Sequence, residues 1–311
     1  MRRAGALVAA ALALVGCNGE EAAMEDLAQR VRDGLVWIEG GTFLPGNYEV
    51  SLRLRDGTVE RREIGTAPPR AVSEVALDGF YVQSLLPTGA DYRLFRDATG
   101  LPEATDLDPD ASVARMPFHE AEAFCLWLGG LTGLPLRLPT EDEWEFAARS
   151  RVLSPPFGTD DGEWERGRNV WKAPEDAGYH VAPPAPGTMP PSPLGLYDLH
   201  GALYQWVSDR AEGDPEDHRI AKGNPAFEDG WTTPIPSRFP VAPMGRDALD
   251  VLPHAAAYFP EGVDAIHRGA VTARCVASVA APPEESGFGR RPPVVAPPAE
   301  PRTFRAVYPG D

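Results

Sequence analysis

The chain has few cysteines, fewer basic than acidic residues, and no long apolar run beyond its N-terminus. Of its 311 residues, 29 are Lys or Arg and 46 are Asp or Glu, which gives a formal net charge of −17. A charge of this sign argues against nucleic acid and anionic lipid surfaces as partners. No later apolar run reaches the ~20 residues that a membrane-spanning helix needs. The length suits one large hydrophobic core or two ordinary ones.

The N-terminus has the parts of a bacterial signal peptide. Arg2 and Arg3 form a short basic segment, and the twelve residues 4–15 form an apolar run that only Gly5 interrupts. Such a run is too short to span a bilayer but suits a signal peptide. The last residues, Leu14-Val15-Gly16, lead into Cys17 and resemble a lipobox. An ordinary secretory signal with an incidental cysteine is the alternative interpretation.

The lipobox resemblance implies that residues 1–16 are removed and that Cys17 carries lipid. Loss of the two N-terminal arginines changes the formal charge from −17 to −19. Two or more acyl chains hold a protein firmly on a membrane, whereas one holds it only marginally. We therefore expect a lipid-anchored protein of the cell envelope. Asn18 stands where an Asp would signal inner-membrane retention, so the outer membrane is favoured if the cell is Gram-negative.

The remaining two cysteines, Cys125 and Cys275, are expected to pair. In an oxidising compartment, two thiols within one domain usually form a disulfide. The bridge would close a loop of about 150 residues, for which the chain-entropy model gives ~5 kcal/mol of stabilisation.

The sequence predicts one main domain with a tether before it. We divide the mature chain into a lipidated tether with a short helix over 17–33, a domain over 34–280 and a Pro-rich segment over 281–311. Strands are expected at 35–43 and within 49–82, and helices at 91–99 and 118–131. From residue 154 onward the periodicity is poor and loops should dominate. Seven prolines within 282–301 favour an extended, polyproline-like conformation.

A capping-box pattern predicts the start of one helix. In Thr140-Glu141-Asp142-Glu143, the Thr140 hydroxyl can accept from the third amide while the Glu143 carboxylate returns to the first. Carboxylates are also favoured in the first helical turn. We interpret the acids of this motif as caps and buried ion pairs rather than catalytic groups. The indoles of Trp127, Trp144 and Trp206 are expected in the core.

Several segments occur in the order seen in a known family. The most specific is the string RLPTEDEWEFAAR at 137–149. The other matching segments are 36–43, 77–82, 117–128, 193–201, Trp206 and 274–276. Together they resemble the formylglycine-generating enzyme family, also called the sulfatase-modifying factor domain. The resemblance implies an α+β, C-type-lectin-like fold that is loop-rich, and a disulfide between Cys125 and Cys275.

The chain lacks the cysteine pair that the family resemblance implies for the reaction. The family oxidises a sulfatase cysteine to formylglycine, and the resemblance implies two nearby cysteines that hold copper through soft thiolate ligands. The matching turn here is 222–227, and no cysteine lies between it and Arg274. His254 and His267 lie in that gap, but we interpret each as an isolated histidine. No copper is expected, and no catalytic residue is assigned.

One of the family's two calcium sites is retained as a candidate. Asn169, the Val170 carbonyl and Asp176 match the order of its oxygen ligands, and the Tyr179 carbonyl is a candidate fourth ligand. Hard oxygen ligands suit Ca²⁺. A plain Asx-turn loop without an ion is the alternative.

The family's second calcium segment has lost its ligands. It follows the pattern G-N-x-x-E-W, which reads G-A-L-Y-Q-W here. Ala202 removes an amide oxygen and Gln205 removes a carboxylate. We expect this second site to be empty while the backbone turn persists.

The leading hypothesis is a lipid-anchored, non-catalytic binding or structural module of the envelope, with residues 210–270 as its variable surface. Its partners would be the membrane, through the lipid, and an envelope protein or glycan. Two alternatives remain open. One is a sulfatase-modifying oxidoreductase or another enzyme that uses the same cleft. The other is a carbohydrate-binding module, suggested by Trp231 and Tyr258.

Overall fold

The computed structural model describes most of the chain. The described residues are 4–65, 73–102, 108–151, 153–172, 184–210, 218–225, 234–241, 271–293, 295, 299 and 301–307. The helices are α1 (Ala4–Gly34), α2 (Gly89–Thr99), α3 (Phe118–Thr132), α4 (Glu141–Ala148) and α7 (Pro283–Ser286). The strands are β1 (Leu35–Ile38), β2 (Gly41–Phe43), β3 (Tyr48–Arg53), β4 (Val59–Ile64), β5 (Val75–Leu77), β6 (Phe80–Gln83), β7 (Leu136–Arg137), β8 (Tyr204–Arg210), β9 (Arg219–Gly223), β10 (Phe239–Val241), β11 (Val271–Thr272), β12 (Val276–Ala277) and β13 (Thr303–Arg305).

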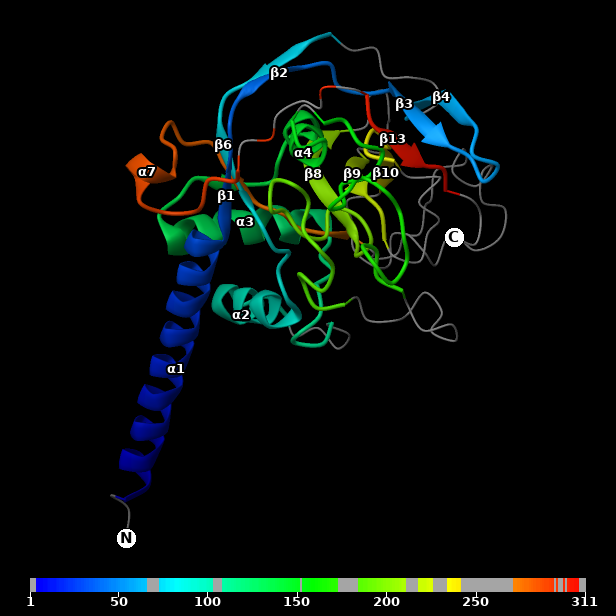
Figure 1. Cartoon of the computed structure of the whole chain (residues 1–311). Helices are drawn as coiled ribbons and strands as arrows, with labels where there is room; N and C mark the ends of the chain where they lie inside the picture. Colours follow the sequence, from blue (N-terminus) through cyan, green and yellow to red (C-terminus); the bar gives the residue numbers. More distant parts are fainter. Residues whose placement is uncertain are drawn as a thin grey trace.

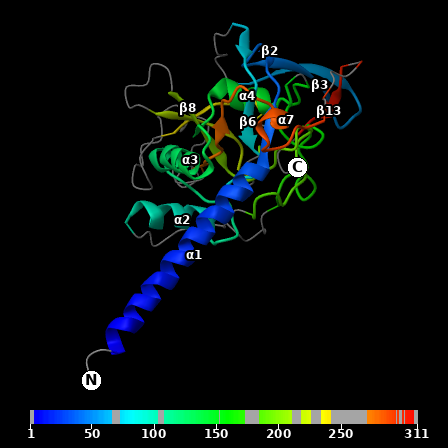
Figure 2. The same cartoon turned by 90° about the vertical axis from the view of Figure 1, so that its left-hand side faces the viewer.

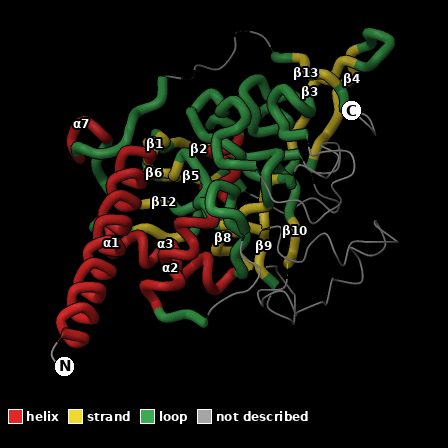
Figure 3. The backbone as a smooth tube through the Cα atoms, turned by 90° about the horizontal axis from the view of Figure 1, so that it is seen from below, coloured by secondary structure: helices red, strands yellow, loops and turns green. Residues whose placement is uncertain are grey.

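Small sheets with long connections between them make up the body of the protein (Figure 1). One four-stranded sheet has the order β1-β6-β12-β7, and a second has the order β10-β9-β8-β11. A three-stranded sheet, β13-β3-β4, and the pair β2-β5 complete the described strands. Figure 3 shows how much loop links these elements, as the sequence predicted.

The sheet that begins with β1 is buried on both faces. Successive residues of β1 point to opposite sides, so Leu35 and Trp37 join one apolar cluster while Val36 and Ile38 join another. The first cluster includes the buried faces of α1, α2 and α3. The second includes Trp144 and its neighbours on α4. Strand β1 therefore connects the two halves of the core.

The helices predicted at 91–99 and 118–131 are confirmed within two residues at each end. Helix α2 begins at a capping box between Thr88 and Asp91 and ends at Gly100, which has a left-handed φ of 67°. Left-handed backbone favours glycine because it has no Cβ. Helix α3 buries Ala121, Phe124 and Leu128 on the predicted face.

Two regions differ from the sequence-based expectation. Strands β8 and β9 lie in the part that was predicted to be loop. The first four residues of β8 and the last four of β9 are all buried, so the sequence does not alternate. The C-terminal segment was predicted to be extended over 282–301, but it begins with the short helix α7. It then lies against the domain: Arg290 bridges to Val36, and β13 pairs in parallel with β3.

Helix α1 is longer than the short helix predicted for the tether. It runs as a single rod from the N-terminus into the domain (Figure 2). Its last two turns bury Leu27, Ala28 and Val31 in the core. Among the described residues, none of the helices has both the length and the apolar character that crossing a membrane requires.

The disulfide between Cys125 and Cys275 is confirmed. Both cysteines are fully buried, and their Cα atoms are 5.5 Å apart. The bridge joins α3 to the residue before β12, across a sequence separation of 150. It thus ties the last strand of the domain core to a helix from its first half.

We expect the double variant Cys125→Ala/Cys275→Ala to lose about 5 kcal/mol of unfolding free energy, because the crosslink no longer restricts the unfolded chain. Urea titration of the oxidised protein measures this change. The matched control is Cys17→Ser, which also removes a cysteine but leaves the bridge intact. Equal unfolding free energies for the double variant and the control would contradict the prediction.

Candidate functional site

The RLPTEDEWEFAAR motif forms the capped N-terminus of α4. The Thr140 hydroxyl accepts from the amide of Glu143 at 3.2 Å, and the Glu143 carboxylate accepts from the amide of Thr140 at 2.8 Å. Arg137 then binds both carboxylate oxygens of Glu143, at 2.7 and 2.8 Å. Bidentate pairs of this kind fix orientation as well as charge. The interpretation of Glu143 as a cap in an ion pair is confirmed.

The other two acids of the motif face a buried lysine. Glu141 and Glu145 are each 1% exposed, and Lys222 of β9 lies between them with no exposed surface. The Lys222 Nζ is 3.4 Å from a Glu141 oxygen and 3.3 Å from a Glu145 oxygen. Arg238 adds an ion pair to Glu141 at 2.8 Å, and Arg149 pairs with Glu145. These carboxylates hold α4 on the sheet.

A second buried polar centre surrounds Arg274, which is 1% exposed. Its Nε donates to the Gln205 side-chain oxygen at 2.7 Å, and the Trp144 indole donates to the same oxygen at 2.9 Å. The Gln205 amide nitrogen in turn donates to the Asp198 carbonyl at 2.7 Å. Both polar atoms of the Gln205 side-chain amide therefore form hydrogen bonds within the protein.

Asp198 lies beside this centre in a strained conformation, with a φ of 57°. Burial raises the pKa of its carboxyl to about 6, although the Gly187 amide and the Arg274 charge act in the opposite direction. Burial likewise lowers the pKa of Arg274 to about 10. Because the Asp198 pKa is higher in the fold than in the unfolded chain, ionised Asp198 opposes folding above pH 6. That penalty disappears as the pH falls towards 4.

The family's second calcium segment has kept its turn. Gly201 has a φ of 85°, and its amide donates to the Asn224 carbonyl at 2.8 Å. A Cβ on Gly201 would lie 2.9 Å from the Val170 side chain, so the close approach requires glycine. Packing and hydrogen bonds to protein groups account for this turn, as the sequence predicted.

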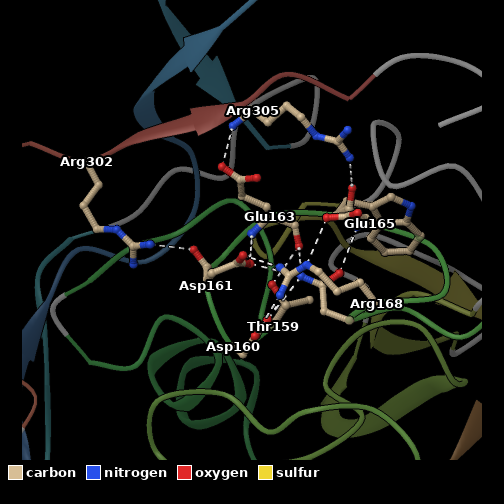
Figure 4. A network of polar contacts seen from close by, with 10 residues as sticks. Thr159, Asp160, Asp161, Glu163, Glu165, Arg168, Arg302 and Arg305 are labelled. Carbon is tan, nitrogen blue, oxygen red and sulfur yellow. Dashed lines mark hydrogen bonds and ion pairs between the residues drawn. The ribbon is translucent and has the colours of Figure 1, made fainter.

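The acidic loop, residues 159–169, carries Asp160, Asp161, Glu163 and Glu165 (Figure 4) and includes Asn169, the first candidate calcium ligand. The Asn169 side-chain nitrogen donates to carboxylate oxygens of Asp160 and Asp161, at 3.2 and 3.0 Å. Arg168 pairs with Asp160 at 3.0 Å, with Glu165 at 2.9 Å and with Asp161. The Arg168 guanidinium thus supplies positive charge among three carboxylates.

The loop is also attached to the C-terminal segment. Arg302 donates to the Asp161 carbonyl at 2.8 Å (Figure 4). The backbone amide of Arg305 donates to the Glu163 carboxylate at 3.0 Å, and its guanidinium donates to the Trp164 carbonyl at 3.0 Å. Strand β13 and the acidic loop therefore hold each other in place.

The candidate calcium ligands are only partly described. The Asn169 side-chain oxygen accepts from the Glu165 amide at 2.8 Å, and the Val170 carbonyl accepts from the Gly167 amide at 2.7 Å. Both oxygens retain a second lone pair. Asp176 and Tyr179 lie outside the described residues. Within the described part of the chain, no three His, Cys, Asp or Glu side chains are arranged to hold a metal ion.

The remaining predicted site positions fall in undescribed segments. They are His254, His267, Trp231 and Tyr258. Of the three tryptophans predicted in the core, Trp144 and Trp206 are each 2% exposed, while Trp127 is partly buried against Phe95 and Phe124.

Sequence reasoning missed Lys222 as the cation for the α4 acids. The sequence placed Lys222 only in a turn, although a lysine before Gly223 in a buried strand is a signal of burial with acids. Arg149 follows Glu145 by four residues, a spacing that brings the two side chains together along the chain. Arg238 carried no comparable pattern, because it pairs with Glu141 from a distant segment that meets α4 only in the fold.

The fold is that of solved structures with a formylglycine-generating-enzyme-like architecture. PvdO from Pseudomonas aeruginosa superposes with a TM-score of 0.55 and 19% identity, over 79% of this chain and 94% of that one. CarF superposes with a TM-score of 0.53 and 14% identity, over 79% and 98%. The predicted α+β, loop-rich fold is confirmed.

The chain belongs to the family described as the sulfatase-modifying factor enzyme 1-like domain, which matches residues 20–245. Inactive C-alpha-formylglycine-generating enzyme 2 of Bos taurus is 31% identical over 117 residues, 36% of this chain and 37% of that protein. Formylglycine-generating enzyme of Mus musculus is 26% identical over 234 residues, 56% of this chain and 58% of that protein. The matches thus span only 37% and 58% of these relatives' own lengths.

We expect Lys222→Met to lower the free energy of unfolding by about 3–5 kcal/mol, because two buried carboxylates lose a cation while the side-chain volume is kept. Chemical denaturation measures the change. Arg291→Met is the matched control: Arg291 pairs with Glu284, but the side chains are 50% and 54% exposed. Exposed pairs contribute about 0–1 kcal/mol. A loss in Lys222→Met no larger than in the control would contradict the structural role of the lysine.

Proposed function

We propose that this protein is a lipid-anchored, non-catalytic family member that serves as a binding or structural module of the bacterial cell envelope. Its anchor would be Cys17, exposed as the N-terminal residue after removal of residues 1–16. An envelope protein or glycan would be its partner, and the outer membrane its location in a Gram-negative cell. Nucleic acid is not an expected partner at a net charge of −17.

The state of the cysteines carries the non-catalytic part of this proposal. The family's oxidase chemistry uses a pair of thiols, and residues 223–274 contain none. Cys125 and Cys275 are joined and fully buried, so neither offers a thiolate to copper or to a substrate cysteine. The similarity to a relative named as inactive supports the same conclusion.

The oxidoreductase alternative has the similarity to the mouse formylglycine-generating enzyme in its favour. It would need another group to bind copper and to pair with the substrate thiol. Histidine could bind copper, but it cannot form a disulfide with the substrate. We therefore place this alternative second.

Calcium binding by the acidic loop is part of the proposal. Asn169 and Val170 would supply two oxygens, and Asp176 and Tyr179 would complete the site. Asp160 and Asp161 contribute negative charge next to Asn169, which favours a cation electrostatically. Arg168, which already pairs with both, would compete with the ion.

No formylglycine should form when the mature protein is mixed with Cu(I), oxygen and a peptide that carries the sulfatase cysteine motif. Mass spectrometry of the peptide measures the thiol-to-aldehyde conversion. The background is set by the same mixture without protein, and an active formylglycine-generating enzyme serves as the positive control. Turnover above the metal-only background would overturn the non-catalytic proposal, and variants of His254 and His267 would then locate the activity.

Cells fed a fatty-acid analogue should attach it to the wild-type protein and not to Cys17→Ser, because the thiol is the acceptor. Gel detection of the label, followed by mass analysis of the N-terminal peptide, identifies the modified residue. The double variant Cys125→Ala/Cys275→Ala tests whether another cysteine accepts the lipid, and it should remain labelled. Equal labelling of wild type and Cys17→Ser would exclude this anchor.

A further inference from the structure

Helix α1 places the N-terminus at one end of the molecule. In Figures 1 and 2 the helix leaves the domain as a rod, and α2 lies on the side of the domain that is nearer the free end of α1. The β3–β4 hairpin lies at the opposite side. If the helix cannot swing, the position of its free end sets the direction in which the hairpin points.

The second half of α1 is built into the domain. Leu27, Ala28 and Val31 are buried, and Leu27 and Val31 belong to the apolar cluster that also contains residues of α2 and α3. Arg30 forms an ion pair with Asp91 of α2 at 2.9 Å. Arg32 contacts the last carbonyls of α3, with distances of 3.5 Å. Both neighbouring helices therefore fix the angle at which α1 leaves the domain.

Backbone hydrogen bonds from other segments hold the junction between α1 and β1. The Arg32 carbonyl accepts from the Gly289 amide at 3.0 Å, and the Gly34 carbonyl accepts from the Ser84 amide at 3.0 Å. The Leu35 carbonyl accepts from the Arg290 amide at 2.8 Å. Backbone groups of the C-terminal segment and of the residue after β6 thus hold the end of the helix.

The free part of α1 is short, exposed and acidic. Nine helical residues lie between Cys17 and Leu27, which is the first buried residue among the described side chains, and the helical rise from Cys17 to Leu27 is about 15 Å. The described side chains between them are exposed, except Met24, which is partly buried. Glu20, Glu21 and Glu25 lie here with no basic residue before Arg30. Negative charge next to an anionic lipid surface favours separation from it.

We propose that α1 is a rigid spacer that turns the α2 side of the domain towards the lipid and projects the β3–β4 hairpin away from it. This inference rests on the proposed lipid anchor at Cys17. It adds an orientation, because a flexible tether of the same length would let any face meet the membrane.

The orientation can be measured with single fluorescent labels on the full-length protein. An added cysteine is the only free thiol, since Cys17 carries lipid and the other two are bridged. Ala98→Cys on α2 and Val59→Cys on β4 both introduce a label at an exposed position. The protein is placed in vesicles of phosphatidylethanolamine and phosphatidylglycerol with an acceptor dye on their headgroups. Energy transfer should be severalfold stronger from residue 98 than from residue 59.

Two spacer variants test whether rigidity causes the difference. Replacement of residues 19–25 by a Gly/Ser sequence should bring the two labels to similar transfer, because the domain can then rotate. Insertion of four alanines after Ala23 lengthens the helix by about 6 Å; it should weaken transfer from both labels and preserve their order. Equal energy transfer from both labels in the parent chain would overturn the proposal that α1 is a rigid spacer. So would a Gly/Ser replacement that leaves the transfer unchanged.

Failure of the anchor can be told apart from failure of the spacer. Mass analysis of the N-terminal peptide reports whether Cys17 carries lipid, and its absence would remove the anchor. Rigidity is measured separately in detergent, from the distance between spin labels at Glu21→Cys and Ala98→Cys. A single narrow distance distribution is expected for the parent helix, and a broad one after Gly/Ser replacement. A broad distribution in the parent chain would overturn the spacer whatever the state of the lipid.

Discussion

The hydrogen bonds of the buried Arg274 guanidinium join the two halves of the core. Arg274 is 1% exposed and donates to the carbonyl of Gln83, at 2.6 Å, and to the side chain of Gln205, at 2.7 Å. It also donates to the Tyr197 carbonyl. A buried cation is costly unless its donors are used, so these acceptors must stay in place. The next two residues, Cys275 and Val276, add the disulfide and the pairing of β12.

The need to satisfy the buried donors of Arg274 explains why the turn after Gly201 keeps its shape with a neutral Gln205. The Gln205 side-chain oxygen accepts hydrogen bonds from Arg274 and Trp144, and the side-chain nitrogen donates one to the Asp198 carbonyl. A glutamate could not donate to that carbonyl. Where the family resemblance implies a glutamate, Gln205 therefore supplies a donor, and the segment is part of the hydrogen-bonded core.

Local patterns in the sequence predicted the features that local physics determines. The capping box at Thr140 and the buried face of α3 were found in this way. The Cys125–Cys275 pair spans 150 residues and was predicted instead from the cysteine count, the oxidising compartment and the family resemblance. Strand β8 was missed because residues buried on both faces show no alternation. The partners of Lys222 were missed because they lie 77 and 81 residues away in the chain. Long-range pairs of this kind leave no local signal.

The Pro-rich C-terminal segment contacts two distant parts of the domain. Its residues 289 and 290 bind the end of α1, and β13 extends the sheet that contains the β3–β4 hairpin. The same short stretch therefore fastens both α1 and the sheet at the opposite side. Each contact uses backbone groups, so most side-chain changes along the segment would affect them little, whereas removing the segment would break both. Gly289 is the exception, because its φ is 71° and a Cβ there would lie 2.9 Å from the Tyr81 ring. The connection between α1 and the far side of the domain is thus built from main-chain hydrogen bonds.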